Sequence, residues 1–369
     1  MASFAKFQRP AQPKSGRITE RDLDIVEAIL RYRFSPTSEL SRLVGGHEDV
    51  NVKRLRKLWE WGYVNRFAFP GIRTHSEFMY YLDSRQPLEL LVQHKRLSAI
   101  HPQMEEELRL NREADYAAAV VRGQHMKLGF LQHSLMISRL HFMLEMASRS
   151  AHGHVELAAW RQGAELRGHK VNVPEIQSRR IEGSNDYVWE EQDRATRLPV
   201  EPDALFSLRF PDRPAEQQLC HFCYEADRGS MPMADMLKKF RSYYQFIKRR
   251  QLHTQAFGVH PIRAVLIETT TEARARKLME LAQHPAVIGA GKRSALFWFI
   301  ISPLFTAPTD AGNGQHVATY LLQPALVLDR LWALPDLTMH GLGDSENSSP
   351  STSIGDGEQI ASVGNRSRA

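Results

Sequence analysis

The stretch that decides the fold of the larger part of the chain is Glu201–Gly229, which reads EPDALFSLRFPDRPAEQQLCHFCYEADRG. It contains two β-like runs, 203–210 and 218–226. Side chains alternate between the two faces of a strand, so Glu225 and Asp227 are expected to point the same way. If Asp203 lies on the neighbouring strand, three carboxylates converge at one end of a sheet.

Three hard oxygen ligands are what a magnesium ion prefers, so Asp203, Glu225 and Asp227 form a candidate site for Mg²⁺ or Mn²⁺. A metal held there could activate a water molecule and stabilise a phosphate in transfer. Lys238 and Lys239 follow on the next predicted helix and could supply a cation to the transition state. The alternative interpretation is that these acids form surface ion pairs with basic neighbours such as Arg228.

Outward from this stretch, β-like runs alternate with helical segments, which predicts an α/β or α+β domain. An amphipathic helix is expected over 130–148 and a Lys-, Tyr- and Phe-rich helix over 232–250. The remaining expected elements are strands at 155–160, 186–190, 262–268 and 295–302 and a helix at 272–283.

The N-terminal part has a different pattern. Helices are predicted over 19–33, 38–44 and 50–61, followed by β-like runs at 63–69 and 77–82 joined by a turn at 70–75. Three short helices and a hairpin are typical of a winged helix-turn-helix, whose third helix enters the major groove of DNA.

Charge supports the same interpretation. Residues 1–100 contain 17 Lys and Arg against 11 Asp and Glu, so they carry the whole net charge of +6. Such asymmetry indicates a local module for a polyanion, because basic side chains neutralise phosphates and release counterions. The candidate DNA-binding residues are Asn51, Lys53, Arg54, Arg56, Lys57, Arg66 and Arg73. Among them, Asn51, Arg54 and Arg56 could reach base edges.

These patterns divide the chain into five parts. The expected parts are a flexible lead (1–16), a winged helix-turn-helix (17–83), a charged helical connector (84–128), an α/β domain (129–335) and a disordered tail (336–369). The connector is also a candidate dimerisation arm, so a homodimer is one expectation.

Composition excludes several classes. No apolar run is long enough for a membrane helix, and the N-terminus has no apolar core of a secretory signal, so a cytoplasmic protein without membrane partners is expected. Two cysteines provide no disulfide framework and indicate a reducing compartment.

Other motifs are weaker. Cys220 and Cys223 form a lone CxxC pair, and zinc needs four ligands. Tyr243 and Tyr244 could be nucleophiles, but no histidine cluster of the relaxase type accompanies them. The Gly-Lys pair in 289–294 lacks the lead of a phosphate-binding loop.

Over about residues 18–305 the chain resembles the replication-relaxation family of plasmids and integrating mobile elements. The residues that carry the resemblance are Pro202-Asp203-Ala204-Leu205-Phe206, Glu225-Ala226-Asp227-Arg228-Gly229, the helix from Lys238 through Tyr243-Tyr244, and the strand Ala264-Val265-Leu266-Ile267-Glu268. The resemblance implies a role in plasmid replication and in DNA relaxation or transfer, with replication or transfer proteins as candidate partners.

The second domain also resembles the PD-(D/E)xK nucleases, which implies a restriction-endonuclease-like fold. Asp203 matches the aspartate of that motif and Glu225 matches its second acid. Asp227 stands where the motif has lysine, the residue that orients or activates the attacking water in that superfamily. Lys238 or Lys239 could have taken over that role from the helix, or the site is inactive.

Three functions therefore remain open. The first is a DNA-binding accessory protein for replication or mobilisation of a mobile element. The second is a metal-dependent endonuclease with ligands Asp203, Glu225 and Asp227 and with Lys238 or Lys239 near the scissile phosphate. The third is a transcriptional regulator whose C-terminal domain senses a ligand or partner.

Overall fold

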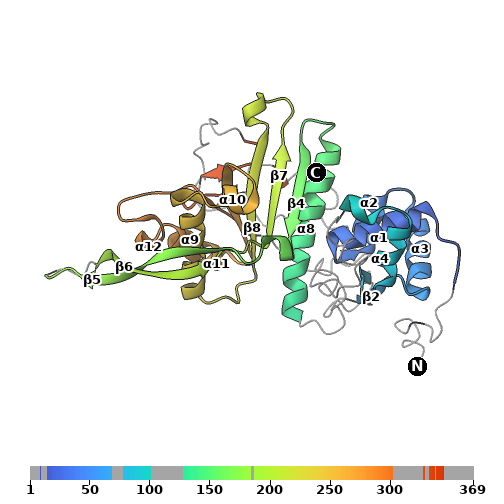
Figure 1. Cartoon of the computed structure of the whole chain (residues 1–369), viewed down its shortest axis with the longest axis horizontal. Coiled ribbons are helices and arrows are strands. Elements are labelled where there is room, and N and C mark those ends of the chain that lie inside the picture. The colour runs from blue at the N-terminus through green and yellow to red at the C-terminus, as the bar shows by residue number, and fades with distance from the viewer. Residues whose placement is uncertain are drawn as a thin grey trace, which may run out of the picture. The chain divides into compact units, whose positions relative to one another are not determined.

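The computed structural model describes Arg9 and residues 15–68, 78–100, 128–183, 187–301, 327–328, 332–336 and 338–344. The chain forms two compact units, Met1–Phe142 and Met143–Ala369, coloured from blue to green and from green to red in Figure 1. The division falls inside the long helix α8 (Leu128–Ser150), which the apolar periodicity predicts over 130–148.

The first unit combines helices with a small sheet. Its elements are α1 (Glu20–Tyr32), β1 (Ser35–Pro36), α2 (Thr37–Val44), α3 (Glu48–Glu60), β2 (Asn65–Ala68), β3 (Phe78–Tyr81), α4 (Gln86–Gln93) and α5 (Leu97–Ile100). The strands form an antiparallel sheet in the order β1-β3-β2. The three expected helices and two expected strands are therefore confirmed, with ends shifted by one or two residues. The predicted turn at 70–75, with Arg73, lies outside the described residues.

The first half of α8 belongs to this unit. Ser138 donates a hydrogen bond of 2.5 Å to the carbonyl of Tyr32, and the ring of His141 lies 4.2 Å from that of Tyr32, centroid to centroid. Arg139 forms an ion pair with buried Glu39 at 3.6 Å. These contacts explain why the division falls within α8, whereas the sequence predicts a boundary after residue 128. Of the predicted connector, α4 and α5 are described, and residues 101–127 lie outside the description.

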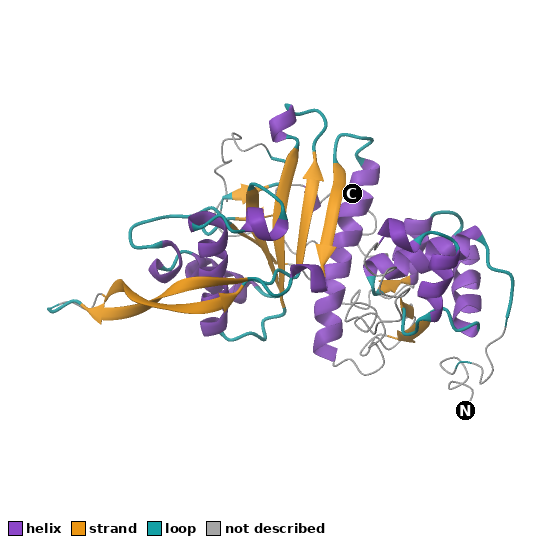
Figure 2. Ribbon diagram, viewed as in Figure 1, coloured by secondary structure: helices purple, strands orange, loops and turns teal. Residues whose placement is uncertain are grey.

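A mixed seven-stranded sheet forms the centre of the second unit (Figure 2). Its order is β12-β11-β10-β9-β8-β7-β4. The strands are β4 (Glu156–Gln162), β7 (Ala204–Arg209), β8 (Leu219–Asp227), β9 (Ile262–Thr269), β10 (Phe297–Ile301), β11 (Trp332–Ala333) and β12 (Met339–His340). Strands β8, β9 and β10 are parallel, and the other pairs are antiparallel. The expected mixture of helices and strands is confirmed.

Helices cover one face of this sheet. They are α9 (Met233–Tyr244), which continues as a π-helical turn, η5 (Gln245–Arg249), together with α10 (His253–Phe257), α11 (Glu272–Ala282) and α12 (Pro285–Ile288). Apolar side chains of α9, among them Phe240, pack on inward-facing residues of β8, β9 and β10, such as Val265 and Phe297. The shorter 3₁₀ turns are η3 (Gly163–Leu166) and η4 (Ala215–Gln217). The packing of α9 on the sheet positions its polar side chains against the end of β8.

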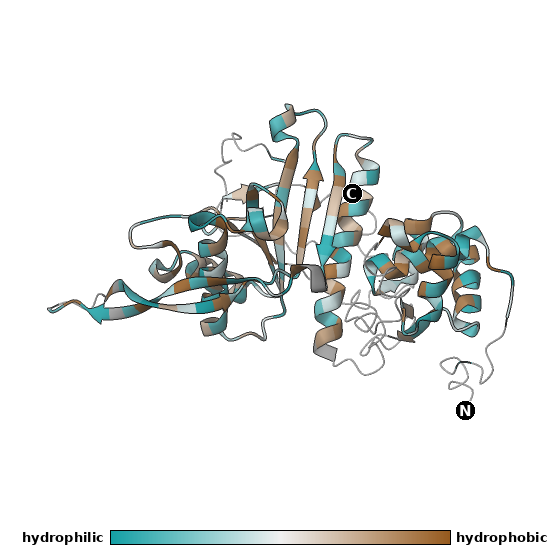
Figure 3. Ribbon diagram, viewed as in Figure 1, coloured by the Kyte–Doolittle hydropathy of each residue, from teal (hydrophilic) through white to brown (hydrophobic). Residues whose placement is uncertain are grey.

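A two-stranded ribbon was only partly predicted. Strands β5 (Lys170–Arg180) and β6 (Tyr187–Pro199) pair with each other and extend away from the sheet (Figure 1). The sequence predicts a strand only at 186–190. Much of the ribbon is polar or charged, as the hydropathy colours of Figure 3 show. Beyond Val171 and Val173, which are buried in the core, it therefore lacks the alternation that a strand with one buried face displays.

The tail was predicted to be disordered from residue 336, but ordered residues continue beyond that point. Met339 and His340 form β12 at the edge of the sheet, and Leu342 is fully buried. Residues 345–369 and most of the predicted lead lie outside the described residues, although Arg9 donates a 2.7 Å hydrogen bond to the carbonyl of Val64. None of the helices in the described ranges has the length and apolar character needed to cross a membrane.

Candidate functional site

Asp203, the residue directly before β7, lies opposite Glu225 of β8. Strands β7 and β8 pair Ala204 with Tyr224, and the backbone N–H of Asp203 donates to the carbonyl of Tyr224 at 3.0 Å. The carboxylate of Asp203 in turn accepts a hydrogen bond of 2.9 Å from the backbone N–H of Ala226. The predicted approach of these two acids therefore follows from the antiparallel register of β7 and β8.

The carboxylate of Glu225 is held by two side chains of α9. Lys239 donates to one oxygen of Glu225, and the hydroxyl of Tyr243 donates to the other. Lys239 and Tyr243 are four residues apart, so they lie on the same face of the helix. Glu225 is 3% exposed, whereas the side chain of Lys239 is 25% exposed and Asp203 is half-buried. The cluster is therefore partly open to solvent on the side of Lys239 and Asp203.

Burial determines the protonation of this cluster. It raises the pKa of Glu225 to about 8; Lys239 opposes this shift and Asp203 adds to it. Burial disfavours the charged form of Lys239, yet the carboxylates of Glu225 and Asp203 raise its pKa above the ordinary value. Lys239 therefore keeps its proton at neutral pH, and burial shifts Glu225 toward its neutral form.

Tyr243 acts in this geometry as a hydrogen-bond donor. It is fully buried, and burial, reinforced by the charge of Glu225, raises its pKa well above the usual range for tyrosine. A tyrosine nucleophile must reach the substrate and lose its proton, and the environment of Tyr243 opposes both. Sequence reasoning missed this role, although the spacing of Lys239 and Tyr243 on one helix face was a usable signal.

The two neighbouring lysines are in different environments. Lys238 is exposed and pairs with Asp235 at 2.9 Å, within the first turns of α9. Lys239 is the lysine that contacts a carboxylate of the sheet. Of the two lysines proposed from sequence, the structure brings only Lys239 to Asp203 and Glu225.

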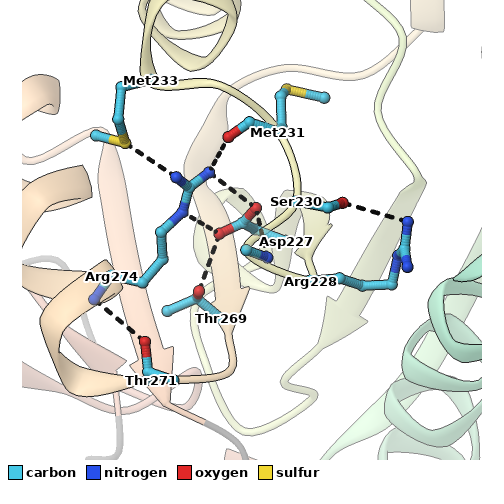
Figure 4. A network of polar contacts seen from close by, with 9 residues as sticks. Asp227, Arg228, Ser230, Met231, Met233, Thr269, Thr271 and Arg274 are labelled. Atoms are coloured by element: carbon cyan, nitrogen blue, oxygen red, sulfur yellow. Dashed lines mark hydrogen bonds and ion pairs between the residues drawn. The ribbon is translucent and has the colours of Figure 1, made fainter.

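Asp227 points into a separate network (Figure 4). Arg274 of α11 binds both its oxygens, with Nε to Oδ2 at 2.9 Å and Nη2 to Oδ1 at 3.2 Å. The hydroxyl of Thr269 donates to Oδ2 at 2.9 Å, and the backbone N–H of Gly229 donates to Oδ1 at 3.1 Å. Asp227 is 6% exposed, and its carboxylate forms a buried ion pair with Arg274. The expectation from strand alternation that Asp227 faces a metal site beside Glu225 is therefore wrong.

Arg274 extends this network to the turn that follows β8. Its Nη2 donates to the carbonyl of Met231 at 2.7 Å, and its Nη1 lies 3.0 Å from the sulfur of Met233 (Figure 4). One guanidinium thus joins the last residue of β8 to the residues that precede and begin α9. Sequence reasoning did not identify Arg274 or Thr269, because both are more than 40 residues from Asp227 in the chain.

Within the described ranges, no group of three or more His, Cys, Asp and Glu side chains is arranged to hold a metal ion. Asp203 and Glu225 remain as a pair of carboxylates with Lys239 beside them. Cys220 and Cys223 are free thiols, and burial raises the pKa of Cys223 far above its usual range, which removes it as a thiolate ligand.

In the first unit, two of the expected DNA-binding residues face inward. Asn51 is 1% exposed, donates to the carbonyl of Gly45 at 3.0 Å and accepts from Arg21 at 3.0 Å. Arg54 binds both carboxylate oxygens of Asp22, which is fully buried at the start of α1. These two side chains connect α3 to the rest of the unit, so neither lies on the exposed face of α3.

The exposed residues of α3 include Lys53, Arg56 and Lys57, together with Val50 and Val52 and the acidic first turn of Glu48 and Asp49. Arg56 is 72% exposed and pairs with Glu60 at 3.1 Å. Arg66 is placed differently, because its guanidinium lies 3.9 Å from the ring of Trp59 and 4.1 Å from that of Phe78. The structure therefore leaves three of the predicted residues exposed on α3.

A family model described as Replication-relaxation matches residues 27–262, which is more than half of the chain. The protein belongs to the replication-relaxation family. The matched region contains α3, β7, β8 and α9, with all the residues of the carboxylate and lysine cluster. Searches of curated proteins and of solved structures each return no match. Membership of this family indicates a role in replication or relaxation of plasmids or mobile elements.

Proposed function

We propose that this protein binds double-stranded DNA and nicks one of its strands in a metal-dependent reaction. The observation that carries the proposal is the convergence of Asp203, Glu225 and Lys239 at one end of the sheet. Two acids and a lysine are the residues of the PD-(D/E)xK motif, with the lysine supplied by α9 in place of Asp227. Nicking of supercoiled DNA relaxes it, which agrees with the family of this chain.

The residues of the cluster fit a magnesium or manganese ion. Mg²⁺ is commonly held by one or two carboxylates, with water and substrate phosphate completing its shell. Each oxygen of Glu225 accepts one hydrogen bond, and a carboxylate has about four lone-pair sites, so sites for a metal remain. Such an ion would polarise the phosphate and lower the pKa of a bound water.

The protein's own residues supply orientation and charge. Tyr243 and Lys239 hold the carboxylate of Glu225 in a fixed position, and the backbone of Ala226 does the same for Asp203. Lys239 keeps its proton, so it can stabilise negative charge that develops on the phosphate. The site is thus organised before the substrate arrives, which lowers the reorganisation needed in the transition state.

The first unit is proposed to be a winged helix-turn-helix that delivers the DNA. Its order of helices and strands matches that plan, and the face of α3 formed by Lys53, Arg56 and Lys57 presents three cations. Such a face suits phosphates and base edges in the major groove.

An accessory protein without catalysis is the second candidate, because the raised pKa of Glu225 disfavours the ionised carboxylate that a metal requires. The experiment is incubation of purified protein with supercoiled plasmid and Mn²⁺, beside the double variant Asp203→Asn, Glu225→Gln. The proposal predicts nicked circles with the wild type and none with the variant. An intact mobility shift without nicking by either protein would reject catalysis and leave the accessory role.

A further inference from the structure

A closed ring of contacts joins the end of β8 to the start of α9. Glu225 and Asp227 lie two residues apart on β8, so they share a face of the strand. Lys239 and Tyr243 of α9 donate hydrogen bonds to Glu225. Arg274 of α11 binds Asp227 and also contacts the residues that lead into α9. The ring therefore runs from the strand through Arg274 into the helix and returns to the strand through Lys239.

Arg274 holds the turn between β8 and α9 on both of its sides (Figure 4). Its Nε and Nη2 bind the carboxylate of Asp227 at 2.9 and 3.2 Å. Its Nη2 also donates to the carbonyl of Met231 at 2.7 Å, and its Nη1 lies 3.0 Å from the sulfur of Met233. In the described part of the chain, the hydrogen bonds of residues 228–231 run to Asp227 or Arg274, apart from one within the turn. Arg274 is therefore the side chain that ties this turn to α11.

The helix α9 begins directly after this contact. Met231 precedes Pro232, which is the N-cap residue of the helix. The carbonyl of Pro232 accepts the backbone N–H groups of Asp235 and Met236, each at 3.1 Å. Arg274 therefore holds the chain one residue before the helix begins. The start of a helix sets the height of all its side chains along the axis, because each residue rises by about 1.5 Å.

Apolar packing determines this height less closely than it determines the rotation of α9. Phe240 packs against the sheet and thereby selects the inward face of the helix. Hydrophobic contact is non-directional, so it tolerates a small slide along the axis. A slide of about 1.5 Å, the rise of one residue, is enough to break the hydrogen bond between Lys239 and Glu225. The ion pair opposes such a slide, because the side chains of Arg274 and Asp227 are 13% and 4% exposed and their two-pronged contact has a fixed geometry.

We propose that Arg274 is a positioning residue for Lys239: through Asp227 and the carbonyl of Met231, it sets the axial position of α9 at which Lys239 meets Glu225. This inference rests on the proposed nuclease function, in which Lys239 stabilises charge on the phosphate. The ion pair of Asp227 and Arg274 then contributes to the site without touching the metal or the phosphate.

The first test is the reactivity of lysine side chains in the full chain, without DNA or metal. Brief acetylation with an N-hydroxysuccinimide ester, followed by mass spectrometry, gives the rate at each lysine. In the wild type, Lys239 should react more slowly than Lys238, because their side chains are 25% and 60% exposed and Lys239 is paired with buried Glu225. Arg274→Gln should raise the rate at Lys239 by about tenfold, as expected for loss of a charge-assisted hydrogen bond, and leave Lys238 unchanged.

Two controls separate a local shift of α9 from a general loss of structure. Arg276→Gln removes an exposed arginine of the same helix, which pairs with Glu272 at 2.6 Å, and should leave the rate at Lys239 unchanged. Alkylation of Cys223 reports opening of the core, because this thiol is fully buried two residues before Glu225. A faster Lys239 with an unchanged Cys223 supports the positioning role. A parallel rise at Cys223, or a Lys239 rate equal to that of the control variant, would reject it.

Removal of both charges separates position from charge compensation. Arg274→Gln alone leaves the buried carboxylate of Asp227 unpaired, which itself destabilises the unit. The double variant Asp227→Asn, Arg274→Gln contains no unpaired charge at this place, but it still lacks the contact with Met231. It should therefore keep the fast acetylation of Lys239. Return of Lys239 to the wild-type rate would reject the positioning role.

Nicking kinetics distinguish this inference from the proposed function. If the wild type nicks DNA, Arg274→Gln should lower the rate at saturating DNA and leave the DNA concentration for half-maximal rate unchanged, because Lys239 acts on the transition state. A wild type that does not nick, with acetylation of Lys239 that depends on Arg274, would reject the nuclease function and keep the positioning role. Nicking by the wild type with no effect of Arg274→Gln on Lys239 would do the reverse.

Discussion

Lys239 of α9 donates a hydrogen bond to the carboxylate of Glu225 on β8, while the adjacent Lys238 points to solvent and pairs with Asp235. Two adjacent residues of the helix therefore differ in position, because Lys239 lies in the candidate active site and Lys238 lies on the surface. This difference provides a pair of matched substitutions, because both lysines share the same helix turn and chemistry.

The ion pair between Arg54 and Asp22 predicts a large effect on stability. Asp22 is fully buried, and the side chain of Arg54 is 16% exposed. Arg54→Ala would leave a buried carboxylate without its partner, which costs about 3 kcal/mol or more. Urea unfolding should detect this loss. Arg56→Ala, on the exposed side of the same helix, should change stability by no more than about 0.5 kcal/mol. Equal effects of the two substitutions would contradict the inward position of Arg54.

The exposed face of α3 predicts a specific loss of DNA affinity. Lys53→Gln and Lys57→Gln should each weaken binding and reduce the salt slope by about 0.9 for each phosphate contact removed. Both side chains are exposed, so the melting temperature should not change. Fluorescence anisotropy with a labelled duplex measures the effect. Unchanged affinity and slope in the double variant would place DNA binding elsewhere.

The order of elements was predictable from sequence, because helices and one-sided strands carry apolar residues at periods of 3.6 and 2. Strand alternation and pairing also indicated that Asp203 and Glu225 approach each other. The partners of charged side chains were not predictable. Arg54 pairs with an acid 32 residues away, and Asp227 pairs with an arginine 47 residues away. Such pairs leave no periodic signal.

The choice between Lys238 and Lys239 also required the structure. A helix over 232–250 places both lysines near its polar side, and only the packing of Phe240 and Tyr243 against the sheet fixes its rotation. The ribbon β5–β6 was missed because most of its length beyond Val171 and Val173 is exposed and has no buried face to impose alternation.

The raised pKa of Glu225 predicts a pH dependence of stability. Its pKa rises from 4.5 to about 8 in the folded protein, so the folded state holds a proton that the unfolded state releases. The resulting stabilisation is complete below the unfolded pKa and is lost as the pH rises through about 8. Glu225→Gln removes this proton exchange. The stability of the wild type relative to Glu225→Gln should therefore fall across that range in urea unfolding, and a constant difference would contradict the assigned protonation.

Tyr243 predicts a shift in the pH profile of metal-dependent nicking. Its hydroxyl donates to Glu225 and thereby opposes the rise in the pKa of that carboxyl. Tyr243→Phe keeps the ring in the core but removes the donor, so the rising limb of the profile should move to higher pH. A uniform loss of rate with an unchanged profile would indicate a packing role alone.

Nicking of supercoiled plasmid in Mn²⁺ by Lys239→Met and by Lys238→Met, beside the wild type, tests the central claim most directly. The account predicts that Lys239→Met lowers the nicking rate by about a hundredfold or more, as expected for loss of a group that stabilises transition-state charge. Lys238→Met should nick at the wild-type rate, with DNA binding intact in both variants. Equal rates for the two variants, or no nicking by the wild type, would contradict the assignment of Asp203, Glu225 and Lys239 as an active site.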